Sequence, residues 1–357
     1  MLNELKSSTT LISSYLTWHL NISPGGVAAF ALLTFFAFFV TIEFYRPRQK
    51  IYIRHIRLSY RANIGLLVFN SFVMTLLSVP SLFILAGQYA DKGLLNFISN
   101  PGWKAVISFL AIDLLLYLLH KASHSFDCLW LFHKVHHNDP HLNVSTAFRL
   151  HFVELLMINL MKAFLIAVLG IEETWLLVNE AIIAFFTMLH HTNISLLGEQ
   201  FLGRVMITPY LHRVHHSTQR VEHDRNYGAV LSIWDRLFGT LAELKPAAIG
   251  INGNSTQDII ELIKFGFISQ TQPSVQPANL DAMIAEAAYY KAEKRGFYPG
   301  NDLRDWLEAK SEIIRLIYGE EQVKTSLMQK WKDLAGFVDN TLTAKNRKYQ
   351  QFQNQIN

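Results

Sequence analysis

Eight of the fifteen histidines in this 357-residue chain fall into three short clusters. Within each cluster the histidines are three or four residues apart, a spacing that places imidazoles on one side of a helix about one turn apart. The clusters are His120-Lys-Ala-Ser-His124, His133-Lys-Val-His136-His137 and His212-Arg-Val-His215-His216. Imidazole is the commonest metal ligand in proteins. Since a zinc site usually takes four ligands, eight histidines indicate two metal ions.

Local signals predict where the cluster-bearing helices begin and end. Pro209 suits the start of a helix that carries the third cluster. The run Asn138-Asp139-Pro140 predicts the end of the helix that carries the second. Cys128 is the single cysteine, so an intrachain disulfide is excluded and thiolates are not the main ligands.

The elements around the clusters are apolar. Hydrophobic residues make up 50% of the chain and charged residues only 17%, against about 25% in soluble proteins. Residues 62–90 carry no charge and are long enough to cross a bilayer of about 30 Å. Five apolar stretches are candidate spans, of which the last two form either full spans or a re-entrant pair: 27–45, 62–90, 105–119, 155–171 and 174–190. The net charge of +4, without a basic cluster interleaved with aromatic residues, gives no support for nucleic-acid binding.

Charge asymmetry predicts the orientation. The loop from Arg46 to Arg61 has six basic residues and no acidic one, as is typical of a cytoplasmic loop. The next loop, around Asp91 and Lys92, is nearly neutral and is expected outside. Every histidine cluster then falls at the cytoplasmic ends of the spans. The predicted fold is all-α: an integral-membrane helical bundle of about four to five spans, with a cytoplasmic histidine-rich helical cap and a small C-terminal helical unit.

Ionisable residues inside membrane stretches are functional candidates. Asp113 is expected to accept a hydrogen bond from a ligand histidine, and Lys162 to neutralise Glu180 across the helical hairpin. His151 is expected to orient the site or to brace the membrane boundary. Three arginines either orient a polar substrate group or pair with carboxylates near the metal, and the sequence leaves both open: Arg149, Arg213 and Arg225. The histidines least expected to be ligands are His19, His55, His141 and His223.

The ligand types bear on the identity of the metal. Zinc would suit hydrolysis, but a hydrolase site needs few ligands and usually a carboxylate base. Soluble di-iron bundles use Glu with Glu-x-x-His motifs, and no such set occurs here. All-imidazole ligation at a membrane face favours an iron centre that activates O₂ against lipid C–H bonds.

The order and spacing of the clusters resemble the fatty acid hydroxylase (sterol desaturase) superfamily over roughly residues 105–242. The linking motifs agree as well: Asn143-Val-Ser-Thr146-Ala-Phe-Arg149, Asn226-Tyr227-Gly228 and Trp234-Asp235-Arg-Leu-Phe-Gly-Thr. The resemblance implies a membrane di-iron oxygenase that hydroxylates or desaturates a lipid such as a sterol or fatty acyl chain. It also implies two iron ions, O₂ as co-substrate and an external electron donor, namely a reductase or a cytochrome- or ferredoxin-type protein. Alternatives are ether-lipid cleavage like that of alkylglycerol monooxygenases, a zinc-dependent membrane hydrolase and a non-catalytic metal-binding protein.

The resemblance implies one further ligand, His191 of His191-Thr192-Asn193, with the adjacent His190 as the competing candidate. The predicted catalytic and metal-binding residues are then His120, His124, His133, His136, His137, His191, His212, His215 and His216. A second resemblance, over 284–309, is to a small bacterial family of unknown function; it suggests a bacterial inner-membrane protein and makes Asp302 a helix N-cap. The predicted organisation is 1–104 N-terminal membrane helices, 105–245 hydroxylase-like catalytic domain, 246–280 linker, 281–318 small helical domain and 319–357 polar tail.

Overall fold

The computed structural model describes residues 23–77, 81–251, 255–268, 280–298 and 300–318. The expectations for the first 22 residues and for the tail, 319–357, lie outside the described residues. Within the described ranges the chain is helical and has no strand, only two isolated bridges, as the sequence predicts. It divides into two compact units, Met1–Ser269 and Gln270–Asn357. Each unit is considered by itself.

Three helices of the first unit are long and apolar enough to cross a membrane, as expected for a helical membrane protein: α2 (Pro24–Tyr45), α5 (Pro101–Ser125) and α7 (Phe152–Leu169). Each begins at a residue that can cap it. Ser23 and Asn100 accept hydrogen bonds from backbone N–H groups of the first turn, and a proline follows each of them. His151 caps α7 in the same way through its Nδ1 atom. Its Nε2–H donates to the carbonyl of Ile263 (3.2 Å), so His151 braces the start of this helix.

Two of the five apolar stretches differ from the expectation. The stretch 62–90 is divided between α3 (Ile53–Leu76) and α4 (Leu82–Tyr89). Helix α3 starts before the apolar stretch and carries three arginines in its first turns; it also buries polar side chains, among them Asn63 and Asn70, within the protein. The stretch 174–190 forms the continuous helix α8 (Glu173–His191), whose apolar sequence contains Glu180 and ends in two histidines. Neither α3 nor α8 is among the helices long and apolar enough to cross a membrane in the described part of the chain.

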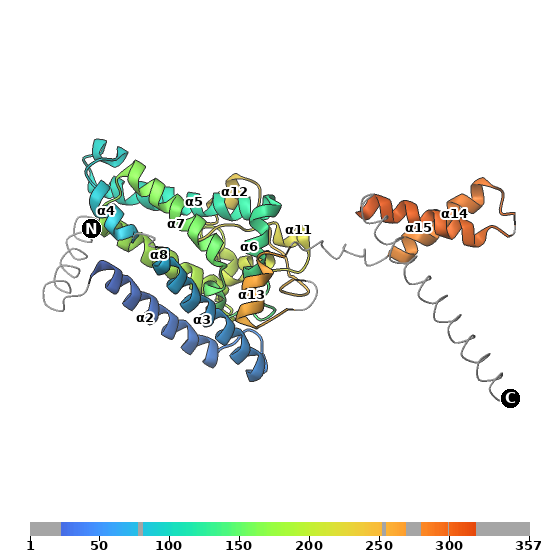
Figure 1. Cartoon of the computed structure of the whole chain (residues 1–357), viewed down its shortest axis with the longest axis horizontal. Coiled ribbons are helices and arrows are strands. Elements are labelled where there is room, and N and C mark those ends of the chain that lie inside the picture. The colour runs from blue at the N-terminus through green and yellow to red at the C-terminus, as the bar shows by residue number, and fades with distance from the viewer. Residues whose placement is uncertain (1–22, 78–80, 252–254, 269–279, 299, 319–357) are drawn as a thin grey trace, which may run out of the picture. The chain divides into compact units, whose positions relative to one another are not determined.

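The long helices form a bundle, with the short helices α6, α11 and α13 at one end and α4 at the other (Figure 1). Helix α8 lies centrally and packs against α2, α4 and α5, while α7 packs against α4 and α5. The buried side chains between them include Ile112, Ile166, Trp175 and Leu176. A second core forms where Phe39 of α2 meets Phe185 and Met188 of α8. This bundle holds the C-terminal ends of α5 and α8 beside the start of α7.

The short helices follow the predicted boundaries where these were read from the sequence. Helix α6 (Asp127–His137) ends directly before Asn138, and α10 (Pro209–His215) begins at Pro209. The other short elements of this unit are η1 (Leu94–Phe97), η2 (Val144–Phe148), α9 (Glu199–Leu202), α11 (Arg220–His223), α12 (Ile233–Leu237) and α13 (Ile259–Phe265). Helix α13 corrects the prediction that 246–280 is a linker, because its Leu262 is fully buried against Ala62, Leu66 and Val135.

Lys162 and Glu180 form the predicted ion pair between α7 and α8. The Lys162 Nζ lies 2.8 Å from Oε1 and 3.0 Å from Oε2 of Glu180. The Lys162 side chain is only 8% exposed, so the charge is costly to bury alone.

We expect the single substitutions Lys162→Glu and Glu180→Lys each to lower the level of folded protein in membranes, because each places two like charges together. The double exchange should recover most of that level, since it restores an ion pair at the same position. Fluorescence-detected size-exclusion chromatography of solubilised membranes measures this. A double variant no better than the worse single variant would contradict the pairing.

The second unit consists of α14 (Leu280–Lys294) and α15 (Asp302–Tyr318), which pack against each other. Arg295 Nε donates to Asp305 Oδ2 (2.8 Å) and Lys291 Nζ to Glu312 Oε1 (2.7 Å). Helix α15 begins at Asp302 itself, so the prediction that Asp302 is the N-cap is wrong by one position. The preceding residue, Asn301, stands at the cap, and its carbonyl accepts from Asp305 N–H.

Candidate metal centre

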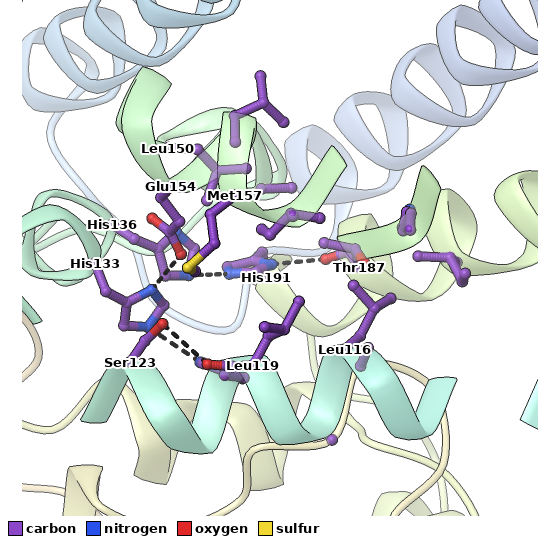
Figure 2. Close-up of a pocket in the computed structure, with 18 of the residues that line it drawn as sticks. Leu116, Leu119, Ser123, His133, His136, Leu150, Glu154, Met157, Thr187 and His191 are labelled. Carbon is purple, nitrogen blue, oxygen red and sulfur yellow. Dashed lines mark hydrogen bonds and ion pairs between the residues drawn. The ribbon is translucent and has the colours of Figure 1, made fainter. Parts of the chain in front are cut away.

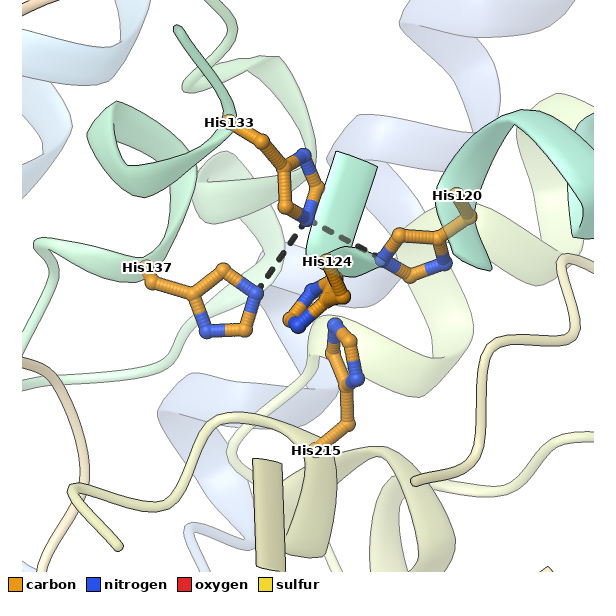
Figure 3. A group of neighbouring side chains, drawn as sticks. All are labelled: His120, His124, His133, His137 and His215. Carbon is orange, nitrogen blue, oxygen red and sulfur yellow. Dashed lines mark hydrogen bonds between the residues drawn. The ribbon is translucent and has the colours of Figure 1, made fainter. Parts of the chain in front are cut away.

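The structure brings all nine histidines of the predicted set together in two groups. The first contains His120, His124, His133, His137 and His215 (Figure 3). The second contains His136, His191, His212 and His216. Within each group one ring nitrogen of every histidine lies within 4.8 Å of the others. The groups adjoin, since the rings of His137 and His216 stack with centroids 4.6 Å apart.

Each His-x-x-His-His cluster divides its histidines between the two groups. In α6, His133 and His137 belong to the first group and His136 to the second. In α10 the assignment is reversed: His212 and His216 belong to the second group and His215 to the first. At 3.6 residues per turn, positions i and i+4 point in nearly the same direction, while i+3 diverges from i+4 by about 100°. Two facing helices with this spacing therefore supply two adjacent sites.

Hydrogen bonds on the outer side fix which nitrogen of five histidines points inward. A backbone carbonyl accepts from Nδ1 of His120 (Tyr227, 2.8 Å), of His191 (Thr187, 2.7 Å) and of His215 (Arg225, 2.8 Å). Carboxylates accept from the other two: Glu154 from His133 (2.6 Å) and Asp224 from His124 (3.1 Å). Because these oxygens accept the bonds, each Nδ1 carries a proton and each ring presents its Nε2 to its group.

The inward nitrogens lie at hydrogen-bonding distance from one another, but too few protons are available to join them all, because histidines such as His120 and His133 carry their proton on Nδ1. His133 Nε2 lies 3.1 Å from His120 Nε2 and 3.2 Å from His137 Nε2. In the second group, His191 Nε2 lies 3.0 Å from His136 Nε2 and 2.9 Å from His212 Nε2. A proton on one nitrogen would bridge only one such pair, whereas a cation would engage all the lone pairs. Two nitrogens bound at right angles to a metal, with bonds of about 2.1 Å, lie about 3.0 Å apart. The residues present therefore fit a metal ion in each group.

The protonation of the histidines outside the membrane helices agrees with this fit. Burial, and then the neighbouring imidazoles, lower the pKa of five of them well below the ordinary value: His136, His137, His212, His215 and His216. They are therefore neutral at pH 7, which is the form that binds a metal.

A cavity of about 300 Å³ reaches the two groups from between α5, α7 and α8 (Figure 2). His133, His136 and His191 line one end of it. Its walls are largely aliphatic, with Leu116, Leu119, Leu150, Leu155, Ile158 and Ile183 among the lining residues. Glu154 also lines the cavity; one of its oxygens holds His133, and the other is buried without a hydrogen-bond partner in the described part of the protein.

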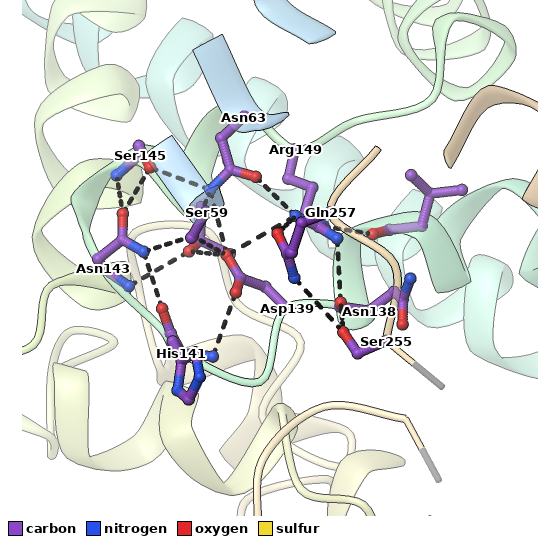
Figure 4. A network of polar contacts seen from close by, with 12 residues as sticks. Ser59, Asn63, Asn138, Asp139, His141, Asn143, Ser145, Arg149, Ser255 and Gln257 are labelled. Carbon is purple, nitrogen blue, oxygen red and sulfur yellow. Dashed lines mark hydrogen bonds and ion pairs between the residues drawn. The ribbon is translucent and has the colours of Figure 1, made fainter. Parts of the chain in front are cut away.

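A buried polar network holds the C-terminal end of α6 (Figure 4). Arg149 is fully buried and donates to the carbonyls of Val135 (3.1 Å) and Asn138 (3.0 Å), on either side of His136 and His137. Its other donors reach Asn63 Oδ1, Gln257 Oε1 and the Thr256 carbonyl. Asp139 Oδ2 accepts from Ser59, Asn63 and Thr146. Of the two roles left open for Arg149, pairing with a carboxylate fits, since its Nη1 lies 4.0 Å from Asp139 Oδ2, and its other bonds hold the end of α6.

The prediction for Asp113 is wrong. Its carboxylate accepts from the backbone N–H groups of Val230 (3.0 Å) and Leu231 (3.2 Å) and from Trp234 Nε1 (2.8 Å), not from a histidine. It therefore anchors the loop that follows Tyr227. Asp235 secures the same loop by accepting from the N–H groups of Tyr227 and Gly228. The Asn-Tyr-Gly and Trp-Asp motifs thus support the carbonyl that orients His120.

The remaining sequence candidates lie around the site. His190 is buried and its ring is 4.0 Å from that of His212, but it belongs to neither group. His223 lies beside His124 with Asp224, a third set of possible ligand atoms. His141 stacks on His55 (4.9 Å), away from both groups. Arg225 Nη1 donates to the Gly239 carbonyl.

Sequence reasoning missed the parts played by Glu154 and Asp224, which hold His133 and His124. Glu154 gave a signal, being a carboxylate near the start of an apolar helix. Asp224 gave none, because its role depends on how α11 folds back against α5.

Helices long and apolar enough to cross a membrane, together with two adjoining groups of histidines that could each hold a metal ion, are the features of a helical membrane protein with a candidate metal centre. Comparison with known protein families narrows the class of this protein. Residues 105–240 match the fatty acid hydroxylase family, which supports the resemblance of this region to the fatty acid hydroxylase and sterol desaturase superfamily. A second match, over 279–314, is to a family of proteins of unknown function.

Three characterised relatives show the breadth of the family. An ornithine lipid hydroxylase of Rhizobium tropici is 29% identical over 54% of this chain and 60% of its own length. The alkylglycerol monooxygenases of Homo sapiens and Danio rerio are each 31% identical, over 48% and 40% of this chain and 40% and 31% of their own lengths. The chain thus spans between about a third and three fifths of these relatives. No solved structure matches significantly.

Proposed function

We propose that this protein is a membrane di-iron oxygenase that hydroxylates or desaturates a lipid C–H bond. The observation that carries the proposal is the arrangement of nine imidazoles, in adjoining groups of five and four, beside a largely aliphatic cavity between α5, α7 and α8. His120, His124, His133, His137 and His215 would hold one iron, and His136, His191, His212 and His216 the other. Bound iron would supply the reduction of O₂, with electrons from an external donor, and the attack on an unreactive C–H bond.

The residues of the chain itself provide positioning and the exclusion of water. The aliphatic side chains of α5, α7 and α8 line the cavity and suit a hydrocarbon segment of a lipid. The buried acceptors Glu154 and Asp224 keep His133 and His124 in the tautomer that binds metal.

Metal analysis and oxygen consumption test this proposal. The full chain, purified from membranes, should contain about two irons and should consume O₂ only with a reductant and a lipid substrate. A single zinc ion and no O₂ dependence would instead identify a hydrolase, and bound metal without turnover a metal-binding protein.

Cleavage of an ether lipid is the second candidate function, favoured by the several alkylglycerol monooxygenases among the relatives. Hydroxylation next to an ether oxygen would release an aldehyde. Lipid profiling of a deletion strain distinguishes the two: the alkylglycerol would accumulate in one case, and a non-hydroxylated or saturated lipid in the other.

We also propose that the histidine site faces the cytoplasm of a bacterial inner membrane. Cys128, the only cysteine, is exposed at the start of α6, beside the site. A membrane-impermeant maleimide should therefore label inverted membrane vesicles but not intact spheroplasts, and Cys128→Ser should abolish the labelling. Labelling of intact spheroplasts would place the site on the opposite face.

A further inference from the structure

A second cavity, of about 400 Å³, lies beside α10 and has a cationic lining. Tyr210 and Arg213 project into it from a different face of α10 than the histidines. Arg48 contributes from the segment after α2, and Lys245 from the segment after α12. Three positive side chains from separate parts of the chain thus meet around one space, and no acidic residue is among those that line it.

Arg213 has unused hydrogen-bonding capacity at this cavity. The residue is only 5% exposed, and its guanidinium donates from Nη2 to Asn193 Oδ1 (3.2 Å). Its Nε–H is buried without a partner in the described part of the chain. The nearby carboxylate of Glu43 is occupied by the N–H groups of Val144 and Asn193 and by the Tyr60 hydroxyl. A buried guanidinium that lacks both a counter-ion and a full set of acceptors is costly unless a ligand supplies them.

The charge balance indicates the ligand. Arg48 pairs with Glu199 (3.0 Å), whereas the other two cations at the cavity, Arg213 and Lys245, form no ion pair within the described part of the chain. A phosphate monoester carries about −1.5 to −2 at pH 7, whereas a carboxylate carries only one negative charge. Arginine also matches phosphate geometry with paired N–H donors.

We propose that this cavity is a binding site for a phosphate group, held by Arg213, Lys245 and Arg48. Its volume exceeds that of a bare phosphate, so the group belongs to a larger molecule. Arg48 lies three residues after the end of α2, a candidate membrane helix, which places the cavity near the membrane boundary. Either a lipid headgroup or a soluble phosphate ester can therefore reach it.

The site is connected to the metal centre through Asn193. Its side-chain oxygen accepts from Arg213 and from Gln49 N–H (3.2 Å), and its amide donates to the Gln49 carbonyl (2.8 Å). Asn193 follows His191 by two residues, and Arg213 follows His212 by one. A phosphate bound here would therefore contact the segments that position two histidines of the second group.

Binding to the full chain in neutral detergent tests the soluble case. Inorganic phosphate should raise the unfolding temperature of the wild type in a saturable manner, and chloride at matched ionic strength should not. Lys245→Gln, at an exposed position that leaves folding intact, should weaken phosphate affinity about tenfold, and Arg213→Gln by at least as much. Lys92→Gln removes the same charge from an exposed loop elsewhere and should leave the affinity unchanged.

Nanodiscs of phosphatidylcholine with and without phosphatidic acid test the lipid case. Stabilisation of the wild type by phosphatidic acid, reduced in Lys245→Gln but not in Lys92→Gln, would identify a lipid phosphate as the ligand. The same pattern with inorganic phosphate would identify a soluble one. A wild type stabilised by neither, or a Lys245→Gln response equal to that of the wild type, would overturn the proposal. Because no arm measures turnover, the result is independent of the proposed oxygenase activity.

Discussion

Replacing one histidine in either group, His215→Ala in the first or His136→Ala in the second, should abolish lipid oxidation while leaving the protein inserted in the membrane. His215 is fixed by the Arg225 carbonyl, and its ring lies 4.4 Å from that of His120. His136 Nε2 lies 3.0 Å from His191 Nε2. Loss of a residue that merely orients a ligand costs about 10–100-fold in metal affinity or activity, so loss of a ligand should cost more than about 100-fold.

Both variants should be assayed for turnover, for metal content and for the amount of protein in membranes. Each should lose bound metal, and their effects should not add, because the two ions of the proposed centre would serve one reaction. His55→Ala is a matched control, since that histidine stacks on His141 outside both groups. Normal turnover in either His215→Ala or His136→Ala would refute a shared two-metal centre.

The histidine spacing predicted that a metal site exists but not how its ligands divide. The i, i+3, i+4 pattern places the imidazoles of α6 on one side of that helix. The helical period separates His133 and His137 from His136, but which histidines of α10 join each group depends on the way α6 faces α10, more than 70 residues further along the chain, and no local pattern encodes this. His191 was reached only through the family resemblance, because a single histidine at a helix end has no distinctive spacing.

The predictions that were wrong failed for the same reason, because they depend on contacts between distant parts of the chain. Asp113 lies about two turns before His120 on the same face of α5. A hydrogen bond to a ligand histidine was therefore a reasonable prediction for an ionisable group in a membrane helix. The loop 230–234 folds over α5 and takes both carboxylate oxygens instead. By charge alone, the stretch 62–90 is predicted to form one membrane span. In the structure, however, Asn63 of α3 donates hydrogen bonds inside the protein, to Asp139 and Ser145. Apolar runs therefore locate membrane helices better than they locate their ends.

Glu154→Ala should weaken metal binding about 10–100-fold, the range measured when the acceptor behind a ligand histidine is removed. Glu154 is 6% exposed, and its Oε1 accepts from His133 Nδ1 at 2.6 Å. Without this acceptor the His133 ring is free to rotate and to shift its proton to Nε2. That nitrogen lies within 3.2 Å of both His120 and His137, so its displacement would disturb the whole first group.

Glu154→Gln distinguishes positioning from charge. The glutamine side chain has the same shape and keeps one oxygen that can accept from His133 Nδ1–H, so it should retain the tautomer and lose less affinity than alanine. Competition with a chelator, followed by metal analysis of the full-length protein, measures both variants without relying on turnover. If Glu154→Ala holds metal as tightly as the wild type, the carboxylate does not orient His133. If Glu154→Gln is as weak as Glu154→Ala, the negative charge rather than the hydrogen bond stabilises the site.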